Sequence, residues 1–415
     1  MSFENLFEAT KKAEQHKRYK PEVLKFNSDL ENNLLLLKKE LESGSYFPGE
    51  YRYFKIFEPK ERDIYAAPYK DRVVHHAVIN IIEPIWEQRF YYHSYACRVN
   101  KGMHKAIDVC QEYLKQNKYV LKCDIKKFFQ SIDHDILKGI IGKRIKDNKL
   151  MRIIELIIDQ SPEMESPQIF FPEDDFISFL EHKNGIPIGN LTSQFFANLY
   201  LSELDTWLKH SKNIKFYLRY MDDFVIFHNS KKFLQNLKEE LTEFLNSLRL
   251  SLHPKKSQIF PAKNGIAFLG FHILPNLRRL RQENIRRFIK RIKEHQRLFS
   301  KFEIDSEHIK QSINAWKGHA AHGDTKELIG KLLYQFSFKR NNVNRSNKLP
   351  IVCCGAVTGT TIQPTTTYAR GIATTTTRPT ATTTSAFVVP ILNNISDREL
   401  YGAFGEKRSP DLFRL

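Results

Sequence analysis

Two acidic segments lie far apart in the chain, and each adjoins a short hydrophobic stretch that predicts a β-strand. In the first, KCDIKKFFQSID, Asp124 follows the stretch from Tyr119 to Cys123. In the second, YMDDFVIF, Asp222 and Asp223 occupy a tight turn between two predicted strands. Carboxylates at strand ends can converge in space, and neighbouring carboxylates are costly unless a cation neutralises them. The pattern therefore predicts a sheet that gathers three aspartates around metal ions.

The chemistry of such a site follows from its ligands. Mg²⁺ prefers hard oxygen ligands and keeps room for phosphate oxygens. Two such ions about 3.5–4 Å apart would activate a 3′-hydroxyl and stabilise a leaving pyrophosphate. An Asp-Asp pair alone is a weak signal, since hairpin turns favour Asp for structural reasons. The interpretation therefore depends on the motifs around it.

Charge indicates the kind of partner. Lys and Arg number 65 against 47 Asp and Glu, a formal charge of +18. This excess favours a polyanion such as nucleic acid, although an ordinary basic surface is the alternative. At about 150 residues per domain, a chain of 415 residues would hold two or three domains, and its apolar content suffices for a full core. We find no apolar run of the roughly 18 residues that a membrane span needs, no secretory signal and no zinc or disulfide spacing, so we expect a cytoplasmic protein.

Hydrophobic periodicity places the motifs on helices and strands. The predicted helices cover 1–45, with a stop at Gly44, then Asp71 to Phe90 from an acidic cap, Lys105 to Gln116, Asp133 to Ile145, Met151 to Asp159, Asn190 to Leu208 and Lys231 to Leu248. The predicted strands or extended segments are Tyr46 to Pro68, Tyr119 to Cys123, Lys215 to Tyr220, Phe224 to Phe227 and short strands within Ser257 to Ile273.

The last third of the chain changes character. Asn276 to Lys301 carries ten Lys and Arg residues and one apolar face, which suits a helix on a nucleic-acid backbone or an ordinary solvated helix. Thr358 to Thr384 holds 14 threonines in 27 residues, and no Asp or Glu occurs from Ser346 to Ser396. We interpret the segment after 346 as a low-complexity tail.

Tyr-Met-Asp-Asp followed by Phe-Val-Ile-Phe, with the Asp124 segment upstream, resembles the polymerase palm of reverse transcriptases. Further motifs follow in the family's order over about residues 45–275. The resemblance implies an α+β fold shaped as a right hand, with fingers, palm and a helical thumb. It also implies RNA-templated DNA synthesis with two Mg²⁺ ions, or Mn²⁺ in their place, at Asp124, Asp222 and Asp223, with the backbone of Ile125 as a further ligand.

The resemblance assigns other residues by motif. ERDIYAAPYKDRVVHHAV resembles the fingers segment that holds the incoming triphosphate, which suggests Arg62 and Arg72, unless these pair with Glu61 or Asp71. HPKKSQIF implies that Lys256 protonates the leaving pyrophosphate. FLGFHI, with Phe268, Leu269 and Gly270, resembles the primer grip, although a plain buried strand is the alternative. Phe129 matches the aromatic residue that excludes a ribose 2′-hydroxyl, with Phe128 in the core; the reverse assignment stays open.

The segment GIPIGNLTSQFFANLYL packs on template and nucleotide in this family, but here it departs from the usual pattern. Ile188 stands before Gly189 where most relatives have Gln, and Gln194 follows Ser193 where they have Pro. Both features resemble the reverse transcriptases of diversity-generating retroelements. The resemblance implies error-prone copying of template adenines, since Ile188 removes an amide that could restrain the templating pair.

The threonine-rich tail suggests a link to the same branch. Thr codons of the form ACA, read one base earlier, become AAC codons for Asn. Cys354 to Val388 would then encode an Asn-rich stretch closed by Ile-Gly-Phe-Arg, which resembles the repeat that this family copies and mutates. A plain flexible tail is the alternative, and the nucleotide sequence of the gene decides between them.

We therefore expect an N-terminal helical extension over 1–45, fingers and palm over 46–275, a basic helical thumb over 276–345 and a tail over 346–415. The expected function is cDNA synthesis from a template-repeat RNA for targeted mutagenesis of a protein-coding gene. Expected partners are the template RNA, the RNA/cDNA hybrid, deoxynucleoside triphosphates and a small basic accessory protein, in a bacterial, archaeal or phage setting. The alternatives are a retron, group II intron-like or phage-defence reverse transcriptase, or a silent palm that only binds RNA.

Overall fold

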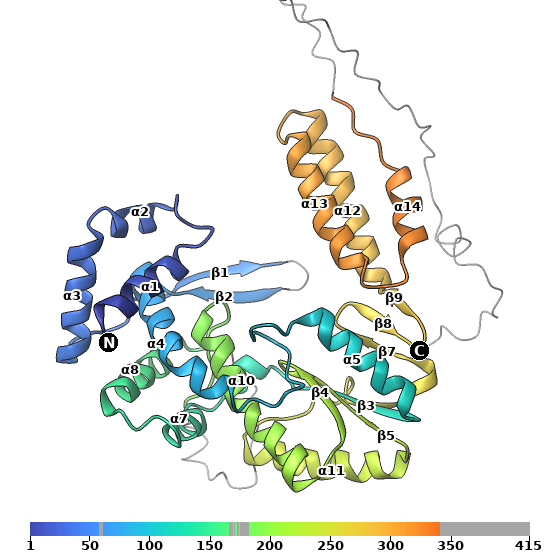
Figure 1. The fold of residues 1–415 in the computed structure, drawn as a ribbon, viewed down its shortest axis with the longest axis horizontal. Coiled ribbons are helices and arrows are strands. Elements are labelled where there is room, and N and C mark those ends of the chain that lie inside the picture. Colours follow the sequence, from blue (N-terminus) through green and yellow to red (C-terminus); the bar gives the residue numbers. More distant parts are fainter. Residues whose placement is uncertain (58–60, 166–168, 170, 172–173, 175–181, 341–415) are drawn as a thin grey trace, which may run out of the picture. The chain divides into compact units, whose positions relative to one another are not determined.

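The computed structural model describes residues 1–57, 61–165, 169, 171, 174 and 182–340 (Figure 1). The predicted tail over 346–415 lies outside these residues. The chain divides into two compact units, Met1–Arg281 and a second that begins at Gln282. Helices and strands are mixed in the first unit, while the described part of the second is helical. The fold is therefore of the mixed α+β kind.

A four-stranded antiparallel sheet forms the centre of the first unit. Its strands run in the order β4 (Phe216–Tyr220), β5 (Asp223–His228), β3 (Tyr119–Asp124) and β6 (Gln258–Pro261). The middle pair, β3 and β5, comes from the two segments that carry the predicted aspartates. Neighbouring strands thus join parts of the chain that are far apart in sequence.

Alternation along the strands gives the sheet two different faces. One face carries Leu121, Cys123 and Phe224, which are fully buried in the main hydrophobic core. This core includes leucines of α11 (Lys231–Ser247) and buried hydrophobic residues of α10 (Leu191–Thr206). Figure 1 shows α11 on one side of the sheet and α5 (Met103–Gln116) on the other.

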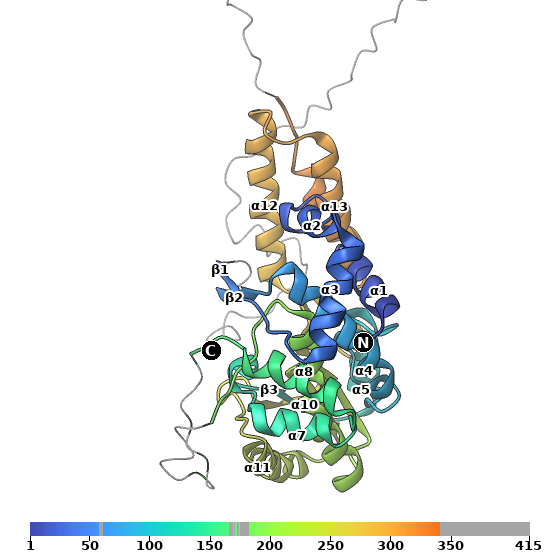
Figure 2. The same cartoon turned by 90° about the vertical axis from the view of Figure 1, so that its left-hand side faces the viewer.

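The remaining helices of the first unit surround this sheet. The N-terminal 43 residues form three helices, and α1 packs along α4, as Figure 2 shows. The helix α3 ends at Ser43 with Gly44 in the left-handed conformation (φ 75°), the stop that the sequence predicts. The bounds of the helices and helical turns not given above are α1 (Phe3–Ala13), α2 (Pro21–Asn27), α3 (Leu30–Ser43), α4 (Tyr69–Glu87), α6 (Phe128–Ser131), α7 (His134–Gly142), α8 (Asn148–Asp159), a π-helical turn (Trp207–Ser211) and a 3-10 turn (Ala262–Asn264).

Two small antiparallel sheets complete the first unit. One is the hairpin of β1 (Arg52–Ile56) and β2 (Arg62–Ala66). The other joins β7 (Ile266–Phe268), β8 (Phe271–Ile273) and β9 (Arg278–Leu280). Four of these five strands fall within stretches where the sequence predicts strands. The fifth, β9, occupies the expected start of the basic helix.

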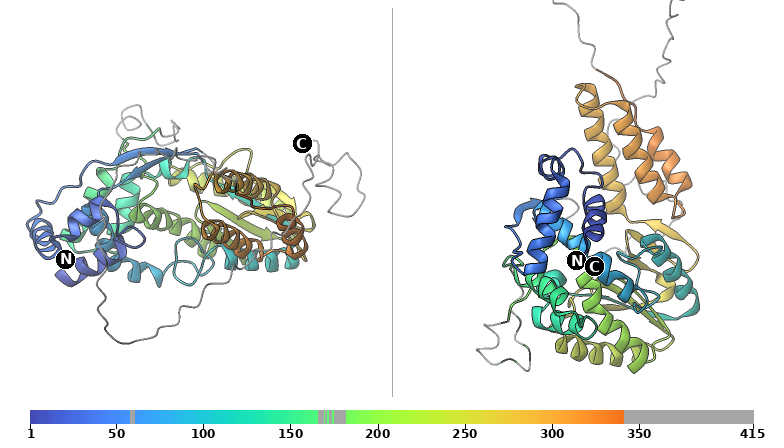
Figure 3. Two further views of the ribbon diagram at one scale, coloured as in Figure 1. Left: turned by 90° about the horizontal axis from the view of Figure 1, so that it is seen from above. Right: turned by 60° about the vertical axis from the view of Figure 1, so that its left-hand side comes forward.

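The second unit contains α12 (Gln282–Ser300), α13 (Ser306–Ala320) and α14 (Lys326–Tyr334). The first two pack side by side, as the orange helices of Figure 3 show. Their contact centres on Phe288 and Trp316, whose rings stack with centroids 3.7 Å apart. Polar and basic side chains cover most of the remaining α12 surface.

Several predicted helix boundaries differ from the structure by about three residues, such as the start of α8 at Asn148 and the end of α7 at Gly142, and two helix starts show particular reasons. The helix expected from Asp71 begins at Tyr69, and Asp71 does not cap it: this buried carboxylate accepts hydrogen bonds from the Tyr46 hydroxyl and the Gly49 amide, both 2.8 Å. The basic helix expected from Asn276 begins at Gln282, because pairing with β8 extends the preceding residues into β9. At α12 a strand pairing distant in sequence determines where the helix starts, and at α4 Asp71 binds residues that precede the helix instead of capping it.

Candidate active site

The three predicted aspartates lie at one end of the central sheet. Asp124 ends β3, and Asp223 begins β5 directly opposite it in the antiparallel ladder. Side chains opposite each other in such a ladder share a face, with Cβ atoms about 5 Å apart. Asp222 precedes Asp223 in the turn that leads out of β4. The structure thus brings the three carboxylates together.

The turn that carries Asp222 contains a residue in the left-handed backbone conformation. Tyr220 pairs with Asp223, so Met221 and Asp222 are its two loop residues. Met221 has a φ of 57°, a left-handed conformation that is uncommon for residues other than Gly. Its carbonyl accepts a hydrogen bond of 3.3 Å from the Arg219 guanidinium. A side chain on the neighbouring strand therefore supports the turn that presents Asp222.

Burial and mutual repulsion perturb the carboxylates. Burial raises the pKa of Asp222, the charge of Asp124 raises it further, and Lys256 and Arg62 oppose the shift. Burial likewise raises the pKa of Asp223 to about 7, against the attraction of Lys122 and with the repulsion of both other aspartates. Such perturbed carboxylates in a cluster are typical of a functional site.

Two lysines partly neutralise the cluster. The Lys256 ammonium lies 2.6 Å from Asp124 Oδ2, and that of Lys122 lies 3.6 Å from Asp223 Oδ1. Asp223 Oδ1 is buried and accepts no hydrogen bond from the described residues. Three carboxylates against two ammonium groups leave a negative charge and one buried carboxylate oxygen without a hydrogen bond, a donor set that suits Mg²⁺. Ile125, whose backbone was predicted as a further ligand, is buried next to Asp124.

The predicted nucleotide-packing segment is attached to β2. The Tyr65 amide donates to the Ile188 carbonyl at 3.2 Å. The Asn190 side chain accepts from the Ala67 amide at 3.1 Å and donates to the Tyr65 carbonyl at 2.8 Å. Gly189, with a φ of 116°, lies so close that an added Cβ would be 2.9 Å from a methyl group of Ile64. These contacts fix Ile188 beside the strand that starts at Arg62.

Two further predicted nucleotide contacts, Phe129 and Gln194, lie in α6 and α10. Phe128 is buried and Phe129 only partly so, which matches the assignment with Phe128 in the core. Gln194 lies in the first turn of α10, and its side-chain carbonyl accepts a 3.4 Å hydrogen bond from the Cys97 thiol. The structure thus gives Gln194 a partner from the loop between α4 and α5.

The two predicted phosphate-binding arginines have different surroundings. The charge of Arg62 lowers the pKa of Asp222, so Arg62 acts on the carboxylate cluster. Arg72 instead pairs with Glu22 of α2 and stacks over the Tyr69 ring at 5.5 Å. The partner of Arg72 is therefore neither of the two acidic residues considered from the sequence. Its contacts are with the N-terminal helices, and a role at the nucleotide stays a prediction.

The predicted primer grip is a tight hairpin. Phe268 pairs with Phe271, and Leu269 and Gly270 both have positive φ, 45° and 87°, in the turn between them. Phe268 is buried, as the alternative of a core strand also expects. The Lys122 ammonium donates to the Ala267 carbonyl at 2.7 Å, so the lysine that pairs with Asp223 also attaches this hairpin to β3.

Lys122 was not predicted as a site residue, although its alternation with Asp124 along β3 places both on one face. A second unpredicted group consists of Asp133, Asp135 and His182, whose ligand atoms lie within 4.8 Å of one another. His182 Nδ1 is 3.1 Å from Asp133 Oδ2, but Arg249 Nε is 3.5 Å from the same oxygen. Because an arginine already supplies positive charge, we interpret this group as an ion-pair network.

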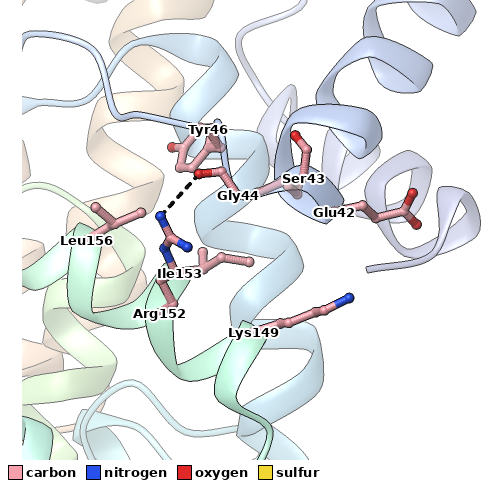
Figure 4. A pocket seen from close by; sticks show the side chains of 9 residues that line it. Glu42, Ser43, Gly44, Tyr46, Lys149, Arg152, Ile153 and Leu156 are labelled. Carbon is pink, nitrogen blue, oxygen red and sulfur yellow. Dashed lines mark hydrogen bonds between the residues drawn. The ribbon is translucent and has the colours of Figure 1, made fainter.

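A pocket away from the carboxylate cluster lies between the end of α3 and α8. Arg152 donates to the Gly44 carbonyl at 3.4 Å, and Glu42, Lys149 and Leu156 also line the pocket (Figure 4). None of the predicted site residues belongs to it. It has no part in the carboxylate cluster.

Comparisons with known proteins match the part of the chain that carries the carboxylate cluster. The family model "Reverse transcriptase (RNA-dependent DNA polymerase)" matches residues 58–273. Protein YkfC of Escherichia coli is 26% identical over 283 residues, which cover 58% of this chain and 71% of that protein. The group II intron-encoded protein LtrA of Lactococcus lactis is 25% identical over 312 residues, 59% of this chain and 50% of that protein. The chain thus spans about half the length of LtrA.

Among solved structures, telomerase from Candida tropicalis in complex with a fragment of telomeric RNA aligns with a TM-score of 0.41 and 13% identity. The alignment covers 73% of this chain and 58% of that one.

In the described part of the chain, every helix is too short or too polar to cross a membrane.

Proposed function

Because this chain belongs to the reverse transcriptase family, we propose that it synthesises DNA on an RNA template at the Asp124, Asp222 and Asp223 cluster. The observation that carries the proposal is the pairing of Asp124 with Asp223 across adjacent strands, with Asp222 in the turn beside them. This arrangement lies inside the region that matches the family model. It concentrates negative charge where a polymerase needs its metal ions.

Each residue near the cluster has a proposed task. Asp124 and Asp222 would hold two Mg²⁺ ions, which when bound supply charge neutralisation for the attacking and leaving oxygens. Asp223, whose Oδ1 accepts no hydrogen bond from the described residues, would add a third carboxylate to the metal site and also holds the Lys122 ammonium. Lys256, now paired with Asp124, would donate a proton to the leaving pyrophosphate. Arg62, whose charge already acts on Asp222, would bind the triphosphate.

For the finer function, we propose error-prone copying of template adenines, as in diversity-generating retroelements. Support comes from Ile188, whose backbone is fixed to β2 while its side chain offers no amide to the templating pair. Gln194 adds support, since it stands where most relatives have Pro. Targeted mutagenesis of a protein-coding gene and a small basic accessory protein belong to this same proposal.

A second candidate is a group II intron-like activity. It is favoured by the likeness to LtrA, which by its name is encoded within a group II intron. The residues Ile188 and Gln194 argue for the diversification proposal. By the resemblance, a group II intron-like enzyme would have Gln at the first of these positions and Pro at the second. The accuracy of copying opposite adenine separates the two.

The experiment is primer extension on an RNA template with all four deoxynucleotides and Mg²⁺, followed by sequencing of the products. Wild type runs beside Asp222→Ala, with and without the accessory protein. Errors concentrated opposite adenine support the diversification proposal. Uniformly low error retains the polymerase and rejects that branch. No synthesis, with metal and RNA binding intact, supports the palm that only binds RNA.

A further inference from the structure

A buried arginine lies directly behind the turn that carries Asp222. Arg219 of β4 has no exposed surface, and its partner Asp205 on α10 is 2% exposed. The guanidinium makes two hydrogen bonds to this carboxylate, of 2.8 Å from Nε and 2.6 Å from Nη2. A buried ion pair is often no more stabilising than a well-packed apolar pair. The pair therefore calls for an explanation other than stability.

The remaining nitrogen of Arg219 provides that explanation. Its Nη1 donates to the Asn198 side-chain carbonyl at 3.0 Å and to the Met221 carbonyl at 3.3 Å. Met221 is the left-handed residue immediately before Asp222. Because the guanidinium is planar and rigid, fixing it on Asp205 also fixes the direction of its other donors. The position of Asp222 is thus tied through one carbonyl to α10.

A short segment, residues 93–97, binds both Arg219 and Asn198. It lies along β4: the Arg219 amide donates to the His93 carbonyl at 3.0 Å, and the Arg219 carbonyl accepts from the Tyr95 amide at 2.9 Å. Asn198 donates to the Ala96 carbonyl at 2.8 Å. We call residues 93–97 the strap.

The strap also reaches the predicted nucleotide contact. Its last residue, Cys97, donates to the side chain of Gln194. Gln194 and Asn198 are four residues apart on α10 and therefore lie on one face of the helix. The strap thus contacts the helix at the position predicted to pack on the nucleotide and at the position that supports Arg219.

We propose that Arg219 is a positioning residue which, held by Asp205 and Asn198, sets the Met221 carbonyl and thereby the place of Asp222 relative to Asp124. In this arrangement α10 serves both the predicted nucleotide contact and the catalytic turn. Arg219 touches no substrate. The inference rests on the proposed polymerase function.

The test compares Arg219→Lys with Arg249→Lys in the full-length chain. Lysine keeps a positive charge for Asp205 but lacks the planar array of donors of a guanidinium. It therefore cannot bind Asp205, Asn198 and Met221 at the same time. Arg249 is the matched control, since it also bonds several side chains, Asp174 and His182 among them, away from the turn. The readouts are thermal unfolding, Mn²⁺ binding by electron paramagnetic resonance, and kcat and KM for deoxynucleotide.

We expect Arg219→Lys to lower kcat at least about tenfold with a smaller change in KM, and to weaken Mn²⁺ binding at a temperature where the protein is folded. Arg249→Lys should lose stability and retain both properties. If the two variants lose activity only in proportion to their loss of stability, or if Mn²⁺ binding is unchanged in Arg219→Lys, the proposal is wrong.

A milder pair of variants guards against misfolding. Asn198→Asp keeps an oxygen for Arg219, whereas Asn198→Leu removes it, so kcat should fall further in the second. Equal kcat values would overturn the coupling to α10. An inactive wild type that binds Mn²⁺ would refute the polymerase function instead, and a normal Mn²⁺ affinity in Arg219→Lys would refute the positioning role separately.

Discussion

At the scale of single residues, the site combines three carboxylates with two lysines of the same chain. We expect Asp222→Asn to reduce nucleotide incorporation at least about 100-fold, because it removes a charge that metal and substrate require. Asp135→Asn is the control, since Asp135 is an exposed aspartate of α7. Comparable loss in both variants in a primer-extension assay would argue against a special role for Asp222.

Lys256 would compete with a bound metal ion for Asp124, because its ammonium lies 2.6 Å from Asp124 Oδ2. We expect Lys256→Met to lower the Mn²⁺ concentration for half-saturation about threefold, a modest effect because this lysine is 47% exposed and water screens its charge. The same variant should slow incorporation. Lys255→Met removes an exposed charge one residue away, and an equal gain in affinity there would show a general field effect.

Asp223 makes stability depend on pH in the absence of metal. Its pKa of about 7 lies above its usual value of 3.8, so the folded state binds the proton more tightly than the unfolded state does. Stability is therefore greatest below about pH 4 with respect to this group, and it declines by roughly 2–4 kcal/mol as the pH rises through 7.

Urea unfolding in EDTA at a series of pH values measures this decline. Asp223→Asn should flatten it, because the amide does not titrate. Mg²⁺ should offset the decline in the wild type, since a bound cation favours the charged carboxylate. A wild type and variant with parallel pH profiles would contradict the assignment.

Residue patterns predicted part of this site. A hydrophobic stretch before Asp124 and the turn at Asp222 are enough to expect strand ends that meet, and the register of β3 and β5 explains why they do. Nothing in the sequence pairs Arg219 with Asp205, because the partner lies on a helix and the contact depends on tertiary packing. The partner of Arg72, Glu22, was missed for the same reason.

At the scale of elements, Gly189 joins the predicted nucleotide segment to β2. Gly189→Ala combines a φ of 116° with a Cβ 2.9 Å from Ile64, so we expect it to cost about 1–3 kcal/mol of folding free energy and to raise KM for nucleotide. Gly139→Ala in α7 is the matched control, as an added Cβ there meets no atom within 4 Å. It should stabilise the protein slightly. Equal melting temperatures for the two variants would show that the segment adapts freely.

Element boundaries depended on contacts that lie outside the element itself. The stop at Gly44 was predictable because a left-handed glycine ends the helix locally. The start of α12 was not, since Arg278–Leu280 pairs with β8 and so becomes strand instead of helix. The sequence therefore predicts a helix end when residues at that end determine it, and fails when a distant strand determines it.

At the scale of the whole molecule, the charge of +18 indicates a polyanionic partner. The α12 helix contributes to it with Lys290 and Lys293. Replacing both with Gln should reduce the slope of log affinity for an RNA/DNA hybrid against log salt by about 1–2, because fewer counterions are released. The pair Lys231→Gln and Lys232→Gln at the exposed start of α11 is the control. Identical slopes for both double variants, measured by fluorescence anisotropy, would exclude a backbone-contacting role for α12.

The attachment of Gln194 and Asn198 to one strap has an evolutionary consequence. If the chain copies adenines with errors as proposed, a lineage that changes its error rate by substitutions on this face of α10 would also disturb the proposed support of the turn that carries Asp222. Copying accuracy and copying speed would then be inherited as linked traits. Descendants that need more errors would be expected to acquire compensating changes within residues 93–97, so this segment should be a place where the history of selection on accuracy is recorded.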